Sequence, residues 1–175
     1  MRTIGLSVVL AAALLSGLLE TTQGEPTPFE QYQDVAPRVD SDPVLQIYVT
    51  LSDKVSLGQT DKGARFIVPI TGGHFKGEGI RGEVEPGGAD WQLVRSDGVK
   101  EIVARYSIRT DDGQVIMVDN RGISHEDSDG LYRLTAPKFH APEGDYDWLN
   151  RGLFVGTITS IAEPRAVVIR VYRLD

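Results

Sequence analysis

Cysteine is absent from the 175 residues of the chain. Without a thiol the protein forms no disulfide and has no nucleophilic cysteine, so its stability has to come from a hydrophobic core. One domain of about 150 residues is large enough for this, because it buries roughly 68–70% of the surface of its unfolded chain.

Positive charge is also scarce. The chain has 18 Lys and Arg against 25 Asp and Glu, a formal net charge of −7. Nucleic acids and anionic membranes bind a basic face that releases their counterions, so neither is an expected partner. His74, His125 and His140 are the three histidines. Since none is paired at metal-ligand spacing and there is no G-x-S-x-G elbow, we expect no metal site and no serine hydrolase.

The run from Gly77 to Gly82 (GEGIRG) matches a dinucleotide-binding pattern. That mechanism needs a helix directly after the glycines, to receive the pyrophosphate. Here Glu83 to Pro86 predicts a strand and then a turn. The glycines are therefore interpreted as allowing tight bends or a close approach of two backbones, and no cofactor is expected.

No helical stripe with caps occurs after residue 24, whereas alternation of polar and apolar residues is frequent. The alternation predicts strands at 45–51, 66–70, 80–84, 91–93, 102–110, 115–118, 153–161 and 167–174. Turn signals such as Asp97-Gly98 recur about every 8 to 15 residues, as in antiparallel sandwiches and barrels. We predict an all-β fold, a single antiparallel β-barrel of about eight or nine strands, because closure leaves fewer exposed edges. Ser128 to Tyr146 is expected to be a loop that lies across one mouth of the barrel.

The N-terminus, residues 1–24, predicts a signal peptide. Arg2 precedes an apolar run from Ile4 to Leu19, and small residues Thr22 and Gly24 suit a signal peptidase. The run is shorter than the roughly 18–20 residues of a spanning helix, and an uncleaved anchor is the alternative. We expect a secreted or periplasmic protein with no membrane contact after cleavage, a disordered leader at 25–42 and a barrel domain at 43–175.

Aromatic and polar residues across the predicted strands favour a small-molecule pocket. The candidate ligand-binding residues are Trp91, Tyr106, Asn120, Tyr132, Trp148 and Asn150, and the candidate catalytic residues are Asp90 and Arg105. In this hypothesis Asp90 is a general base and Arg105 a charged donor to a developing oxyanion. Alternation places Arg105 opposite Tyr106, so the alternative puts Arg105 on the outer wall or at a subunit interface and both tryptophans in the core.

Seven motifs resemble one known family. They are VPITGG at 68–73, GGADWQLV at 87–94, DG at 97–98, ARY at 104–106, TDDG at 110–113, WLNR at 148–151 and VIRVY at 168–172. In them the chain is similar to the domain of unknown function 3237 family, also called uncharacterised protein family 0311, from about Pro43 to the end. The resemblance implies a compact β-barrel. Most members have no established activity, and some fungal relatives are associated with ring-forming steps in natural-product pathways.

Three functional hypotheses follow. The first is an exported barrel that binds an apolar or aromatic small molecule and isomerises or cyclises it without a cofactor. The second is a non-catalytic carrier with the same pocket, since small barrels hold one ligand. The third is a homo-oligomeric structural barrel with a packed interior. A polar-lined cavity would favour the first two over the third.

Overall fold

A computed structural model describes residue 27, residues 30–31 and residues 38–175. The chain divides into two units, Met1–Arg38 and Val39–Asp175, and the fold is that of the second. The predicted signal peptide and most of the predicted leader lie outside the described residues, although Ser41 and Asp42 already belong to the first strand. No helix in the described part of the chain has the length and apolar character needed to cross a membrane.

Ten strands and one short 3-10 helix build the unit Val39–Asp175. They are β1 (Ser41–Leu51), β2 (Val55–Thr60), β3 (Gly63–Gly77), β4 (Ile80–Val84), β5 (Ala89–Val94), β6 (Lys100–Thr110), β7 (Val115–Asp127), β8 (Gly130–His140), η1 (Asp147–Asn150), β9 (Leu153–Ile161) and β10 (Ala166–Leu174).

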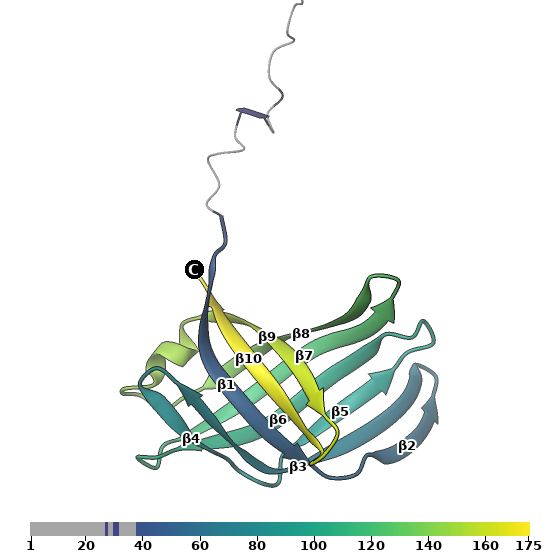
Figure 1. The fold of residues 1–175 in the computed structure, drawn as a ribbon, viewed down its shortest axis with the longest axis horizontal. Coiled ribbons are helices and arrows are strands. Elements are labelled where there is room, and N and C mark those ends of the chain that lie inside the picture. The colour runs from purple at the N-terminus through teal and green to yellow at the C-terminus, as the bar shows by residue number, and fades with distance from the viewer. Residues whose placement is uncertain (1–26, 28–29, 32–37) are drawn as a thin grey trace, which may run out of the picture. The chain divides into compact units, whose positions relative to one another are not determined.

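Antiparallel pairing closes the sheet into a barrel (Figure 1). The strand order is β1-β10-β9-β8-β7-β6-β4-β3-β2, and β1 pairs with β3 as well as with β10. Since β4 and β5 pair with different stretches of the same two strands, β3 and β6, they share one position in a ring of eight. β2 pairs with β3 outside that ring. The predicted all-β antiparallel barrel is confirmed.

Strand β6 shows the alternation that the sequence predicts. Ile102, Ala104, Tyr106 and Ile108 are buried, and Ile108 is 0% exposed. Arg105 lies between them and is exposed on the outer wall. The inward face of the strand is therefore the predicted one.

The glycine run that matches the dinucleotide pattern forms a hairpin. Gly77 ends β3 and Ile80 begins β4, with no helix between them. At Gly82, a Cβ atom would overlap the backbone of Arg109 on the neighbouring strand. The glycines serve the turn and the close approach of two strands, as expected.

Two strands were not predicted from the sequence. Gly130–His140, within the stretch expected to be a loop, is strand β8, so that expectation was wrong. Its inward positions include Arg133, Thr135 and Pro137, which are polar or conformationally restricted and hide the alternation. Pro137 is tolerated because β8 pairs with β9 only at Leu134 and Thr135. β2 is exposed along almost its whole length and shows no apolar face.

Large apolar side chains fill one end of the barrel. Leu149 of η1 is buried in the core there, and Trp148 and Tyr146 pack against that core. Phe139 at the end of β8 and Phe154 at the start of β9 meet edge to face, with ring centroids 5.2 Å apart. The segment that links β8 to β9 thus closes the end of the barrel where β8 finishes.

Candidate functional site

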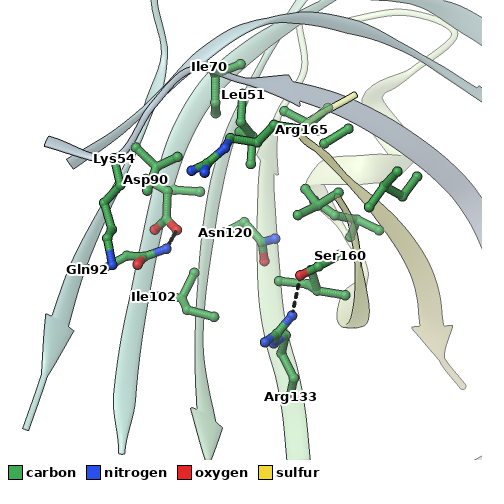
Figure 2. Close-up of a pocket in the computed structure, with 18 of the residues that line it drawn as sticks. Leu51, Lys54, Ile70, Asp90, Gln92, Ile102, Asn120, Arg133, Ser160 and Arg165 are labelled. Carbon is green, nitrogen blue, oxygen red and sulfur yellow. Dashed lines mark hydrogen bonds between the residues drawn. The ribbon is translucent and has the colours of Figure 1, made fainter. Parts of the chain in front are cut away.

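The end of the barrel where β8 begins holds a cavity of about 590 Å³ (Figure 2). Aliphatic side chains from several strands, among them Val49, Ile70, Ile102, Ile158 and Ile169, form much of its wall. The polar and charged residues that line it are Lys54, Asp90, Gln92, Lys100, Tyr106, Asn120, Arg133, Ser160, Glu163 and Arg165. The cavity therefore combines apolar walls with a few polar groups, as small-molecule sites do.

The strand register shows how deep in the cavity each of these polar residues lies. Asp90 on β5 and Asn120 on β7 both pair with Ala104 of β6, from its two sides. Tyr106 lies two residues further along β6, toward the packed core. Lys100 lies four residues in the other direction, about 14 Å along the strand, at the level of Arg133 on β8. Cations therefore stand at the mouth, and Asp90, Asn120 and Tyr106 lie deeper.

Asp90 is held by two hydrogen bonds. Its Oδ2 accepts one of 2.6 Å from Nε2 of Gln92, and its Oδ1 accepts one of 3.1 Å from the backbone N–H of Val103. Burial raises the pKa of Asp90, although these hydrogen bonds and the charge of Lys100 oppose the shift. A carboxylate that is fixed in place and made more basic has the properties of a general base.

Two buried polar atoms on the cavity lining lack partners among the described residues. Neither the hydroxyl of Tyr106 nor Oδ1 of Asn120 makes a hydrogen bond to the described residues. Burial raises the pKa of Tyr106, so its hydroxyl stays protonated at neutral pH and is available as a donor. Because buried polar groups are normally paired, two unpaired ones on the cavity lining point to a bound polar molecule.

Several cations surround the mouth. Burial lowers the pKa of Lys100, and the positive charges of Arg133 and Lys54 lower it further. Arg133 donates hydrogen bonds to Oγ of Ser124 at 3.1 Å and Oγ of Ser160 at 2.7 Å. Figure 2 shows Lys54 and Asp90 on one wall and Arg133 with Ser160 on the other. Like charges are thus held close together around one opening.

The Asp90–Arg105 pair proposed from the sequence is not formed. Arg105 points outward with its side chain 54% exposed, and its Nε lies 3.2 Å from Oδ2 of Asp119 on β7. Trp91 is 40% exposed on the outer wall, since its neighbours Asp90 and Gln92 face inward. Of the two alternatives for Arg105, the outer wall is the one observed.

Three other candidates lie away from the cavity. Tyr132 is exposed and stacks on His125, with centroids 5.0 Å apart. Trp148 packs at the closed end, 6.3 Å from the ring of Phe154. The Asn150 side chain bonds the backbone N–H and carbonyl of Ala141, both at 2.9 Å. The contacts of Trp148 and Asn150 stabilise the segment that links β8 to β9, whereas the stacking of Tyr132 joins β8 to β7.

Sequence reasoning missed Gln92, Lys100 and Arg133. Lys100 was accessible to it, because it lies two residues from the predicted inward position Ile102, whereas Gln92 faces inward only if Asp90 does. Arg133 was hidden in the stretch predicted as a loop. For a metal, the part of the chain that the structure describes offers no group of three His, Cys, Asp or Glu side chains.

Comparisons with known proteins bear on the family. The family model for a protein of unknown function (DUF3237) matches residues 40–174. A UPF0311 protein of Rhodopseudomonas palustris is 36% identical over 154 residues, which cover 80% of this chain and 99% of the relative. A UPF0311 protein of Clostridium acetobutylicum is 33% identical over 147 residues, 75% of this chain and 92% of the relative.

Solved structures are similar as well. The crystal structure of a conserved protein of unknown function from R. palustris has a TM-score of 0.75 and 36% identity, covering 80% of this chain and all of that one. A β-barrel-like protein from Acinetobacter baumannii has a TM-score of 0.75 and 31% identity, covering 80% and 98%. An enzyme from Penicillium herquei, 22% identical with a TM-score of 0.66 over 80% and 98%, shares the fold. With its own barrel and these matches, the chain belongs to the DUF3237 family.

Proposed function

We propose that the barrel binds a small molecule with an apolar or aromatic body in the cavity and transfers a proton on it, isomerising it or closing a ring. The observation that carries this proposal is that Asp90, Asn120 and Tyr106 line one cavity. A volume of about 590 Å³ is within the roughly 300–1,000 Å³ of small-molecule sites.

Asp90 is the proton acceptor in this mechanism. It takes a proton from one atom of the bound molecule and returns it to another, so the formula of the molecule does not change. Negative charge that develops on a substrate oxygen is stabilised by the hydroxyl of Tyr106, which stays neutral and has no partner among the described residues. Tyr106 thus takes the role that the sequence hypothesis gave to Arg105.

The first experiment identifies the ligand. Small molecules that co-purify with the protein are extracted and identified by untargeted mass spectrometry, and each is returned to the protein in deuterated water. We expect deuterium incorporation or conversion to an isomer. Asp90→Asn should lower that rate about 10²–10⁴-fold, and Tyr106→Phe about 10²–10³-fold. Arg105→Gln, on the outer wall, is the control and should leave the rate unchanged.

A non-catalytic carrier is the second candidate. It is favoured by the unpaired atoms of Tyr106 and Asn120, which serve binding as well as they serve catalysis. In a carrier, Asn120→Leu weakens retention of the co-purified molecule, whereas no variant at Asp90 changes its chemistry. Wild-type rates of exchange in Asp90→Asn would therefore reject proton transfer by Asp90 and leave the carrier.

A further inference from the structure

The charge at the mouth of the cavity is opposite in sign to that of the whole chain. Four cations line the cavity, Lys54, Lys100, Arg133 and Arg165, against the two carboxylates Asp90 and Glu163, which leaves an excess of two positive charges. The chain as a whole has a formal net charge of −7. Positive charge is thus concentrated where a ligand enters.

These cations are poorly neutralised by the protein. Among the described residues, no carboxylate oxygen lies within 4.0 Å of a side-chain nitrogen of Lys54, Lys100 or Arg133. Arg165 lies 3.8 Å from Asp53, whose side chain is 97% exposed. Lys54 instead lies over the ring of Phe66, 4.1 Å from its centroid.

Arg133 is held in place by hydrogen bonds that occupy only some of its donors. A guanidinium has five N–H donors, and Arg133 spends one from Nε and one from an Nη on Ser124 and Ser160. The remaining donors have no partner among the described residues and can bind a planar anion, in the geometry that arginine offers to carboxylates. The two serines fix the side chain, so little conformational entropy is lost when the anion binds.

We propose that the molecule bound in the cavity is an organic acid, whose carboxylate is held at the mouth by Lys100, Arg133 and Lys54 while its apolar body extends toward Asn120 and Tyr106. This inference rests on the proposed function, because it names the class of molecule for the same cavity. The carboxylate relieves the repulsion among the cations and stays near solvent, where its desolvation costs least.

A pair of dyes tests the proposal on the full chain. Anilinonaphthalene sulfonate carries an aromatic body and one negative charge, and phenylnaphthylamine is the same body without the sulfonate. Both fluoresce more strongly in apolar surroundings, so their affinities are measured by titration. We expect the charged dye to bind about tenfold or more tightly, since charge-assisted hydrogen bonds are the strong ones. Its advantage should shrink as salt concentration rises.

Variants distinguish binding by the cations at the cavity mouth from an effect of net charge alone. Lys100→Gln and Arg133→Gln should each remove most of the advantage of the charged dye and leave the uncharged dye unaffected. Lys138→Gln is the matched control, because Lys138 is exposed on β8 between two inward residues and does not line the cavity. It makes the same change in net charge and should leave both affinities unchanged. Circular dichroism confirms that each variant is folded.

The outcomes distinguish the two proposals. Equal binding of both dyes, or the same loss in Lys138→Gln as in Lys100→Gln, contradicts anion recognition while the cavity remains a binding site. Failure of both dyes to bind contradicts the proposed function itself. Competition by naphthoate and by naphthyl phosphate identifies the anion: stronger displacement by naphthoate supports a carboxylate, and stronger displacement by the phosphate overturns that assignment.

Discussion

Asp90 and Asp119 are carboxylates in opposite electrostatic surroundings. Asp90 faces the cavity, where burial raises its pKa. Asp119 faces the outer wall, where burial also acts to raise the pKa but Arg121 and Arg105 outweigh it, so the pKa of Asp119 is lowered. The two residues should therefore contribute to stability with opposite dependence on pH.

Asp90→Asn should make the protein more stable than wild type at neutral pH, and the gain should disappear in acid. With a native pKa above the unfolded value, wild-type Asp90 binds its proton more tightly in the folded state. Stability is therefore lost as pH rises from the unfolded pKa through the native one. Thermal melts of both proteins from acid to neutral pH measure the difference. A difference that does not grow with pH would show that burial does not dominate at Asp90.

Asp119→Asn is the control of opposite sign. Its lowered pKa gives stability that is present above the unfolded pKa and lost as pH falls through the native pKa. The variant should thus melt below wild type at neutral pH and approach it in acid.

The candidate site residues include two pairs of strand neighbours, and this limits how well the sequence could predict the site. A regular strand turns neighbouring side chains to opposite faces, so Asp90 and Trp91 cannot both line a cavity, nor can Arg105 and Tyr106. The burial of Ile102 and Ile108 predicts Tyr106 inside and Arg105 outside, as observed. Which member of the first pair faces inward depends on the pairing of β5 with β6, which local alternation does not reveal.

Strand β6 is the element on which a single substitution tests the fold. Ile108→Asp places a carboxylate at a position with 0% exposure. An unpaired buried charge costs about 3–5 kcal/mol, a large part of the roughly 5–15 kcal/mol that stabilise a domain. We expect the variant to be unfolded or to melt far below wild type, as measured by far-ultraviolet circular dichroism.

Met117→Asp on the neighbouring strand is the control. Met117 is 46% exposed on the outer wall of β7, in register with Ser107. Its melting temperature should stay close to that of wild type. If Ile108→Asp were harmless and Met117→Asp disruptive, the inward and outward faces of the barrel would be exchanged.

At the scale of the whole molecule, the cavity exists because the large side chains inside the barrel are concentrated at one end. Phe139, Leu149 and Phe154 fill one end, whereas inward positions near the other include the small residues Ala104 and Gly122. The sequence predicts the strands and their closure from alternation and turns. The full set of residues that line the cavity could not be predicted from the sequence, because closure brings together strands from opposite ends of the chain, β1 with β10 and β3.

We infer that the protein is exported, and its N-terminus allows a direct test. Arg2, the apolar run from Ile4 to Leu19 and the small residues Thr22 and Gly24 have the order of a cleaved signal peptide. Intact-mass measurement of protein recovered from its host should give a chain that begins at Glu25. Gly24→Tyr puts a bulky side chain at the expected cleavage site and should leave the precursor uncut, while Glu25→Gln, just beyond it, should be processed normally. Recovery of wild-type chains that still begin with Met1 as soluble cytoplasmic protein would contradict export, and the organic acid proposed as the ligand would then have to be sought inside the cell.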